Sequence, residues 1–265
     1  HFAAETHVDT SIRDPLLFVR NNINSFGIFL NEVHSYWSRC DATKQDLFRF
    51  VNISTDEVYG ALQVDEQPFS ENHPFKPNNP YSASKAAADC LVRSFFKTFG
   101  MPSVTIHAAN NYGPWQQPEK LIPLMIHRAL NKVEMPIYGD GSNMRDWLYV
   151  EDNCSAIWSA YQKGVPGEAY NIGAGQEISN NQVVSQIVQL LDDKLPLPGG
   201  VSYNAYVEFV DDRIGHDFRY SIDSSKAREQ FNWRPTVTFD QGMALTVCWY
   251  LANQKWLADA NENIK

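Results

Sequence analysis

Two short motifs separated by a proline-rich loop constrain the fold most strongly. The first, STDEVYG at 54–60, follows an apolar run at 48–53 that is typical of a buried parallel strand. The second, YSASK at 81–85, opens a run with helical periodicity that ends near Gly100. Ligands of α/β sheets bind at the carboxyl ends of the strands. The order strand, acidic turn and helix therefore predicts an α/β fold with a site where the first run ends.

The residue types in these motifs suit proton transfer. Tyr81 and Lys85 are four residues apart, so on a helix they share one face and the ammonium lies beside the phenol. A nearby cation lowers the pKa of a phenol, and the tyrosinate can take a proton from a hydroxyl group as hydride leaves the carbon. Asp56 and Glu57 add an acid and a base that simple alcohol oxidation does not need. The set indicates oxidation with a second step, such as loss of water.

A structural interpretation competes with each of these assignments. A tyrosine at the start of a helix commonly packs its ring on the core, and a lysine on a helix is commonly solvated. An Asp-Glu pair is by default a solvated turn. The Tyr-Lys spacing, the Ser82–Ser84 context and the position of the acids at the end of a strand together favour chemistry.

Length and composition bound the class of protein. The chain has 265 residues, 43% hydrophobic and 20% charged, which suits one large folded domain or two smaller ones. Its net charge of −9 argues against a broad nucleic-acid surface, although a nucleotide ligand needs only a few cations. No apolar stretch is long enough to span a membrane, and no signal peptide is visible at the start.

Cysteine and histidine usage predicts a cytoplasmic protein without a metal. Cys40, Cys90, Cys154 and Cys248 are far apart and form no C-x-x-C pair, which is typical of free thiols in a reducing cytosol. The seven histidines show no metal-ligand spacing, so we expect no metal site.

Periodicity and turn signals predict alternating helices and strands. A long amphipathic helix is expected from Asp14 to Trp37, and its apolar stripe is Leu16, Leu17, Val19, Ile23, Phe26, Leu30, Val33 and Trp37. Asn79-Pro80 and Gly100 mark the start and end of the next helix. Further expected elements are strands at 48–54, 103–109, 147–150 and 169–172, and helices at 121–130, 151–162, 179–191 and 240–252. Loops are expected at 61–80 and 192–205, and the tail after Trp256 is expected to fray.

Several further stretches, taken in order, resemble one family. They are HFAAETHVD at 1–9, NNYGP at 110–114, PEKLIP at 118–123, RDWLYVED at 145–152, YNIG at 170–173 and HDFRY at 216–220. With the two motifs above, they resemble the extended short-chain dehydrogenase/reductases, and within them the dTDP-glucose 4,6-dehydratases, from residue 1 to about 252. A lone Y-x-x-x-K is weak evidence, but this many motifs in order are strong. The Asp-Glu pair and PEKLIP favour the dehydratases over epimerase relatives.

The resemblance implies a Rossmann-type parallel sheet that is N-terminally incomplete, with a smaller C-terminal α/β substrate-binding domain, and NAD as the cofactor. Residues 1–110 would form a partial NAD-binding domain, and residues 111–265 would mainly bind a nucleotide-sugar, with some segments returning to the Rossmann sheet. The implied reaction converts dTDP-glucose to dTDP-4-keto-6-deoxyglucose by oxidation at carbon 4, loss of water across carbons 5 and 6, and hydride return to carbon 6. A UDP-sugar dehydratase or epimerase of the same fold, and an inactive truncated nucleotide-sugar-binding chain, stay open as alternatives.

The resemblance also implies a role for each motif residue. Tyr81 would be the base at carbon 4, and Thr55 would hydrogen-bond the oxygen there. Asp56 would protonate the hydroxyl that leaves carbon 6, and Glu57 would remove the proton at carbon 5. Asp56 must then be protonated at neutral pH, which requires a pKa raised by burial or by Glu57. The implied cofactor contacts are Ala4, Ser54, Tyr81 and Lys85.

The substrate contacts and the assembly are implied in the same way. Lys120, Arg145 and Arg213 can neutralise a diphosphate, and Tyr138 offers a ring for stacking on a base. The full set of implied nucleotide-sugar contacts is Glu5, His7, Asn110, Glu119, Lys120, Leu121, Pro136, Tyr138, Arg145, Asn180, Arg213 and His216. The helices near 15–37 and 81–99 would build a homodimer.

The chain departs from the family pattern in places. It contains no G-x-x-G-x-x-G loop, which in relatives holds the cofactor pyrophosphate at a helix N-terminus. In the family HFAAETH ends the fourth strand, so we expect three strands and their helices to precede it. A truncated sequence, an unrecorded segment and a shortened protein are the three explanations. Smaller departures are Gln117, where relatives usually have an aromatic residue, and His107-Ala108 in place of Asn-Cys or a similar pair.

Overall fold

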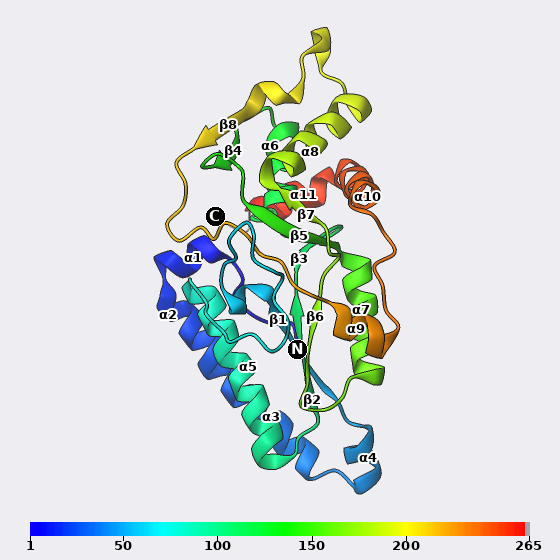
Figure 1. Cartoon of the computed structure of the whole chain (residues 1–265). Helices are drawn as coiled ribbons and strands as arrows, with labels where there is room; N and C mark the ends of the chain where they lie inside the picture. The colour runs from blue at the N-terminus through cyan, green and yellow to red at the C-terminus, as the bar shows by residue number, and fades with distance from the viewer. Residues whose placement is uncertain (263–265) are drawn as a thin grey trace.

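A parallel sheet of three strands, in the order β1-β2-β6, lies at the centre of the lower half of the molecule in Figure 1. The computed structural model describes residues 1–262. The strands are β1 (Phe50–Thr55), β2 (Ser103–Ala108) and β6 (Ala169–Ile172). Each residue of β1 pairs in parallel register with one of β2, and every residue of β2 is buried. The expected α/β fold with a parallel sheet is confirmed, and 169–172 does return to the first sheet.

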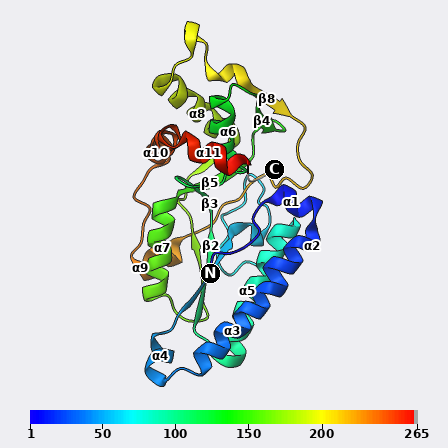
Figure 2. The same cartoon turned by 180° about the vertical axis from the view of Figure 1, so that it is seen from behind.

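Helices cover both faces of this sheet (Figures 1 and 2). On one side, α3 (Phe26–Ser38) and α5 (Pro80–Phe99) bury Phe26, Leu30, Ala88 and Val92 against β1. On the other side, α7 (Val150–Lys163) and α9 (Ser225–Phe231) bury their alanines and Phe231 against β2 and β6. The predicted limits of α5 are confirmed, because Asn79 forms a capping box and Gly100 closes the helix at a φ of 73°.

The first helical stretch departs from the expected single amphipathic helix. Helical structure does run from residue 15 to 38, as α2 (Pro15–Phe18), a π-helical segment (Val19–Ser25) and α3. A π-turn takes more residues per turn than an α-turn, so it rotates the face that the preceding residues present. Leu16 and Val19 are therefore 62% and 41% exposed, whereas Phe18, outside the predicted stripe, is fully buried. The predicted stripe was wrong at these positions and right at Phe26 and Leu30.

The upper half of the molecule contains two smaller sheets and a separate core. One sheet has the order β3-β5-β7, and the other pairs β4 with β8. The strands are β3 (Asn110–Tyr112), β4 (Met135–Tyr138), β5 (Met144–Tyr149), β7 (Glu177–Ser179) and β8 (Val207–Val210). The helices packed around them are α6 (Leu121–Leu130), α8 (Asn180–Lys194), α10 (Phe239–Ala252) and α11 (Gln254–Glu262).

Most expected elements are found within three residues of their predicted limits, but several short ones were not expected. These are α1 (Val8–Arg13), α4 (Ala42–Leu47), α9 and the strands β3, β4, β7 and β8. The tail was expected to fray, but α11 continues to Glu262 with Leu257 buried, and residues 263–265 lie outside the described part. Among residues 1–262, no helix is long and apolar enough to cross a bilayer.

Candidate active site

The acidic motif forms a tight turn where β1 ends. Residues Asp56–Tyr59 make one turn of 3-10 helix, and Thr55 caps it by accepting the Glu57 N–H at 3.3 Å. The Thr55 hydroxyl in turn donates to Asp56 Oδ1 at 3.3 Å. Asp56 is only 2% exposed and Thr55 8%. The structure therefore places these acids at the carboxyl end of a buried strand, where ligands of α/β sheets bind.

The start of α5 is held against this turn. Asn79 caps α5 through its Oδ1 and also donates from Nδ2 to Glu57 Oε2 at 3.4 Å. Pro80 occupies the first helical turn, and Tyr81 follows it with its ring edge-on to Phe18, the ring centroids 6.3 Å apart. Tyr81 is 9% exposed. One side chain thus both starts the helix and brings the tyrosine beside the acids.

Lys85 lies one helical turn after Tyr81 and points at the end of β1. Its ammonium donates to the carbonyl of Ile53 at 2.6 Å, and the residue is 6% exposed. Burial lowers the pKa of Lys85, and the Asp89 carboxylate opposes that effect. The lysine is therefore placed beside the acidic turn at 56–59 and not in solvent.

The expected effect of Lys85 on Tyr81 was wrong for the chain as it stands. Burial raises the pKa of Tyr81, the Glu57 charge raises it further, and hydrogen bonding with Thr55 opposes both. Lys85 directs its ammonium at a backbone carbonyl, and desolvation outweighs the charge of a cation that is itself buried. The phenol is therefore neutral in this structure.

Burial raises the pKa of both acids, and the groups that oppose the rise differ between them. Burial raises the pKa of Asp56 to about 8, with Glu57 and Asp146 adding to the rise and Arg145 opposing it. Burial also raises the pKa of Glu57, but Arg145 and the hydrogen bond from Asn79 oppose it. The Oδ2 atom of Asp56 is buried and has no hydrogen-bond partner among the described residues. Asp56 thus meets the requirement for a carboxylic acid that is protonated at neutral pH.

Arg145, on β5, carries a buried positive charge that lowers the pKa of both acids. Its guanidinium lies over the ring of Tyr220, 4.4 Å from the centroid, and donates to the carbonyls of Asp217 at 2.8 Å and Phe218 at 3.0 Å. The residue is 6% exposed. A buried guanidinium with its fork held by carbonyls acts on Asp56 and Glu57 as a fixed charge.

A second group of predicted residues gathers around the first nine residues of the chain. Lys120 donates to the carbonyl of Thr6 at 2.6 Å, and Arg213 lies 3.4 Å from the carboxylate of Asp9. The charge of Glu57 raises the pKa of Lys120, while burial, the largest effect, lowers it. The lysine is therefore close enough to the acidic turn for the charge of Glu57 to affect its pKa.

Other predicted residues complete this group. The Nε2 atom of His7 lies 3.8 Å from the carboxylate of Asp9, and burial lowers the pKa of His7. His216 pairs with Asp212 at 2.7 Å, and the ring of Tyr138 lies 6.3 Å from that of His216 in an edge-on arrangement. Glu119 lies 3.8 Å from the ammonium of Lys120. Cationic and aromatic side chains thus meet on the same side as the acidic turn.

The remaining predicted residues lie at the edges of this arrangement. Asn110 begins β3 with its Oδ1 buried and unpaired among the described residues, and Leu121 is the first residue of α6. Glu5 accepts a hydrogen bond from Asn21 at 2.9 Å. Pro136 lies in β4 and Asn180 begins α8, and their recorded contacts are with β8 and with the carbonyl of Asn143. Within residues 1–262, neither residue has a hydrogen bond or a strand pairing with the acidic turn at 56–59.

Sequence reasoning missed two residues of the site. Asn79 was identified as a helix cap but not as the partner of Glu57, and nothing local in the sequence indicates that contact. Asp146 lies in the RDWLYVED stretch, and burial raises its pKa to about 6 although three backbone N–H groups bond to it. Its charge also raises the pKa of Asp56, and nothing local in the sequence indicates that effect.

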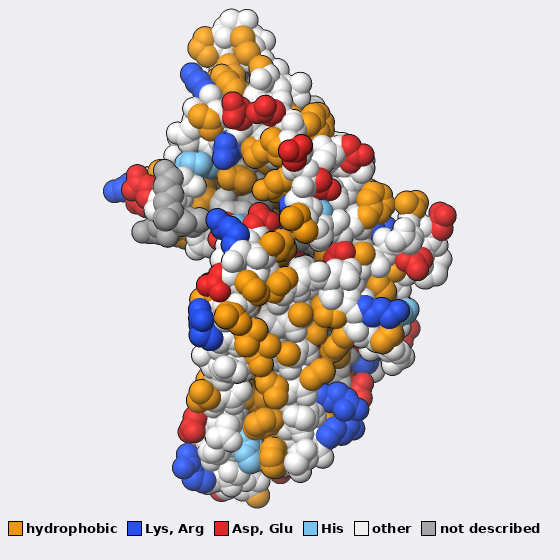
Figure 3. Space-filling view, turned by 90° about the vertical axis from the view of Figure 1, so that its left-hand side faces the viewer, with side chains coloured by type: hydrophobic (Ala, Val, Ile, Leu, Met, Phe, Trp, Pro, Cys, Tyr) orange, Lys and Arg blue, Asp and Glu red, His pale blue; other side chains and the backbone are white. Residues whose placement is uncertain are grey.

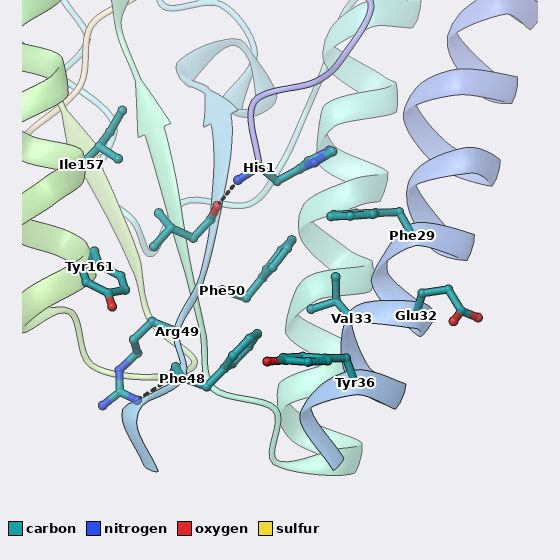
Figure 4. A pocket seen from close by; sticks show the side chains of 11 residues that line it. His1, Phe29, Glu32, Val33, Tyr36, Phe48, Arg49, Phe50, Ile157 and Tyr161 are labelled. Carbon is teal, nitrogen blue, oxygen red and sulfur yellow. Dashed lines mark hydrogen bonds between the residues drawn. The ribbon is translucent and has the colours of Figure 1, made fainter. Parts of the chain in front are cut away.

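An apolar hollow beside β1 lies apart from these residues (Figure 4). It has a volume of about 660 Å³ and is lined by His1, Phe29, Phe48, Phe50, Ile157 and Tyr161, among others. Its walls belong to β1, α3 and α7 and include none of the predicted site residues. The candidate site is therefore defined by the turn after β1 and the start of α5.

Within residues 1–262, no group of three or more histidine, cysteine or acidic side chains could hold a metal ion. The four cysteines are free.

Comparison with known proteins places the chain. A family model described as GDP-mannose 4,6 dehydratase matches residues 1–246. The chain belongs to this family. Among curated relatives, a dTDP-glucose 4,6-dehydratase of Xanthomonas campestris pv. campestris (strain B100) is 49% identical over 97% of this chain and 73% of its own length. The dTDP-glucose 4,6-dehydratase 1 of Escherichia coli (strain K12) is 45% identical over the whole chain and 74% of its own length.

Solved structures give the same result for the fold. DesIV, a dTDP-glucose 4,6-dehydratase from Streptomyces venezuelae solved with NAD and TYD bound, has a TM-score of 0.86 at 38% identity, covering 97% of this chain and 73% of that one. The Bacillus anthracis dTDP-glucose 4,6-dehydratase in complex with NAD has a TM-score of 0.82 at 41% identity, covering 98% and 74%. A Thermus thermophilus UDP-glucose 4-epimerase with NAD has a TM-score of 0.82 at 26% identity, covering 95% and 76%.

Proposed function

We propose that the chain is an NAD-dependent lyase that converts dTDP-glucose to dTDP-4-keto-6-deoxyglucose. The observation that supports it most directly is a buried carboxylic acid, Asp56, whose pKa is raised to about 8 beside a second acid and a tyrosine. Oxidation alone needs the tyrosine, and elimination of water also needs an acid and a base. The printed names of the curated relatives support the same substrate.

The donors at the end of β1 fit a dinucleotide. Lys85 uses one of its three N–H donors on Ile53 and keeps two for a ribose hydroxyl. Ser54 turns its hydroxyl inward to Asp89, so its backbone would face the cofactor beside Ala4. When bound, NAD would accept hydride from carbon 4 and return it to carbon 6, and its positive ring would lower the pKa of Tyr81. We assign residues 1–110 with β6 to this role, and most of 111–265 to the nucleotide-sugar.

The side chains of this chain then move the protons. Tyr81 takes the proton of the carbon 4 hydroxyl, whose oxygen Thr55 holds by a hydrogen bond. The resulting ketone acidifies the proton at carbon 5, and Glu57 removes it. As the carbon 5–carbon 6 double bond forms, the carbon 6–oxygen bond breaks and Asp56 gives its proton to the leaving hydroxyl, which departs as water. Hydride then returns to carbon 6, and Glu57, whose carboxyl proton exchanges with solvent, protonates carbon 5.

The cationic group around the first nine residues suits the diphosphate and the base. The charges of Arg213 and Asp9 both act on the pKa of Lys120, and Arg213 lies 3.4 Å from the carboxylate of Asp9. The side chains of Lys120 and Arg213 each have N–H groups that can donate hydrogen bonds to a phosphate. The rings of Tyr138 and His216 lie edge-on to one another and would pack against the base. The other predicted contacts, from Glu5 to Asn180, would complete the pocket.

An exposed apolar face supports a homodimer. Figure 3 shows hydrophobic side chains gathered on the side of the molecule formed by the helices at the left of Figure 1. Those helices expose Leu16, Ile28, Phe29, Tyr36 and Phe99 by 43–68%. A face of this kind on two neighbouring helices is typical of an interface. Sedimentation of the native chain and of Ile28→Lys tests it, because the charge would shift a dimer towards monomer.

The reaction itself is tested by mass spectrometry. The folded chain is incubated with NAD and with dTDP-glucose or UDP-glucose, and the masses of the products are measured. The dehydratase gives a product lighter by one water from dTDP-glucose. An epimerase would give a product of unchanged mass, and a binding protein would return the substrate unaltered, and either result from folded protein would overturn the proposal.

A further inference from the structure

A buried carboxylate on α5 binds side chains from two strands of the central sheet. Asp89 lies one helical turn after Lys85 and is 5% exposed. Its Oδ1 accepts from Asn52 at 2.8 Å, and its Oδ2 accepts from Ser54 at 2.7 Å. A ring nitrogen of His107, on β2, lies 3.2 Å from the same Oδ2. One side chain therefore joins α5 to β1 and β2.

The hydrogen-bond pattern assigns the protonation of His107. Asn171 donates from Nδ2 to the carbonyl of Phe69 at 2.8 Å, so its Oδ1 faces Tyr59 and accepts the phenol proton at 2.9 Å. A phenol has one proton, so at 2.7 Å the Nδ1 of His107 must donate to Tyr59. Its Nε2 must also carry hydrogen to bond the carboxylate of Asp89. By this count His107 is an imidazolium paired with Asp89, assigned from the network and not observed directly.

This network holds both ends of the catalytic turn, which comprises residues 55–59. Ser54 directly precedes Thr55, and Tyr59 is the last residue of the 3-10 turn that contains Asp56 and Glu57. Ser54 is held by Asp89, and Tyr59 is held by His107. All of these side chains are at least nine-tenths buried, so water does not compete for the hydrogen bonds. The turn is fixed at its start and its end to α5, which also bears Tyr81 and Lys85.

We propose that Asp89 and His107 form a buried ion pair that positions the catalytic turn, holding residues 55–58 at a set distance from Tyr81 and Lys85. The proposal rests on the proposed function for its effect on rate, and on the network alone for its effect on structure. Neither residue touches the reacting atoms, so both are positioning residues. The Asp89 carboxylate also opposes the lowering of the pKa of Lys85 by burial.

Kinetics test the effect on rate. In Asp89→Asn, the amide cannot accept from all three donors, so we expect kcat to fall by roughly 10- to 100-fold while KM changes by less than about 3-fold, as for a displacement near 1 Å. The double variant Asp89→Asn/His107→Asn should recover part of that loss, because the lone imidazolium is removed. Asp152→Asn is the matched control. Its carboxylate is 4% exposed and accepts from the Thr236 and Val237 N–H groups.

Hydrogen exchange tests the effect on structure without any turnover. Peptides covering 53–60 should exchange at least several-fold faster in Asp89→Asn and at the native rate in Asp152→Asn. If Asp89→Asn fails to fold, Tyr59→Phe replaces it in this experiment. Because it removes only one hydroxyl, it should increase the exchange rate at 53–60 by a smaller factor than is expected for Asp89→Asn. If folded native protein has no dehydratase activity, the proposed function is overturned. The comparison of exchange rates at 53–60 still tests the positioning role, because it needs no turnover. Folded Asp89→Asn with native exchange at 53–60, or with native kcat, would overturn the proposal.

Discussion

Replacing Asp56 by asparagine should change the stability of the protein in a pH-dependent way. The side chain is 2% exposed, and its pKa rises from 3.8 to about 8 on folding. Because the folded pKa lies above the unfolded one, the folded state binds the proton more tightly. The stability linked to this proton is fully present below pH 4, falls as pH rises from 4 to 8, and is constant above pH 8.

The shift gives the magnitude. About four pKa units at about 1.4 kcal/mol each correspond to a loss on the order of 5 kcal/mol between pH 4 and pH 8. Asparagine cannot ionise and has nearly the same shape, so Asp56→Asn escapes that loss. The free energy of unfolding of the variant minus that of native protein should therefore increase by roughly 4 kcal/mol between pH 4 and pH 7, and by about 5 kcal/mol between pH 4 and pH 9.

Urea unfolding of both proteins at several pH values between 4 and 9 measures this difference. Asp152→Asn is a suitable control, because it replaces another buried carboxylate, on α7. A stability difference between Asp56→Asn and native protein that stays constant from pH 4 to pH 9 would falsify the raised pKa. The same variant should also lose dehydration by roughly 10²- to 10⁴-fold, because an amide cannot supply the carboxylic proton.

Three further predictions follow from the same geometry. Dehydration rate should fall tenfold per pH unit above about pH 8, as Asp56 loses the proton it must donate, and a rate that keeps rising to pH 10 would exclude it as the acid. Glu57→Gln should stop solvent deuterium entering carbon 5 and slow dehydration by roughly 10²- to 10⁴-fold, whereas native label uptake would remove Glu57 from the mechanism. Gly60→Ala should lower stability by more than about 1 kcal/mol, because φ is +91° and the added Cβ would lie 2.5 Å from a backbone oxygen, and an unchanged thermal midpoint would contradict that strain.

The parts of the site that depend on local sequence could be predicted. The end of β1, the capped start of α5 and the one-turn spacing of Tyr81 and Lys85 follow from periodicity, turn chemistry and helix geometry. Helices α6, α7, α8 and α10 were also placed within three residues of their limits, and α8 and α10 each begin with a capping box.

The parts that depend on tertiary contacts could not be predicted. The π-helical segment at 19–25 rotates the preceding face, and no sequence signal distinguishes it from a continuous α-helix. Strands β4 and β8 are four residues each and pair over about seventy positions of chain, so neither shows a period. The effect of Lys85 on Tyr81 was misjudged, because spacing places two side chains side by side but does not tell how deeply the phenol is buried.

His107 shows how a departure from a family pattern can become informative once contacts are known. In the sequence it is a lone histidine in a strand, which is most often a satisfied core residue. In the structure it pairs with Asp89 and reaches Tyr59 at the far end of the catalytic turn. The chemical consequence follows from the partners on both ring nitrogens and could not follow from the residue alone.

The central claim is that this site oxidises carbon 4 and returns the same hydride to carbon 6. The most direct measurement uses dTDP-glucose with deuterium at carbon 4, incubated with the folded chain and NAD and analysed by mass spectrometry and NMR. We expect a product lighter by one water with the deuterium at carbon 6. A product of unchanged mass, unaltered substrate, or a dehydrated product that has lost the deuterium would contradict the account.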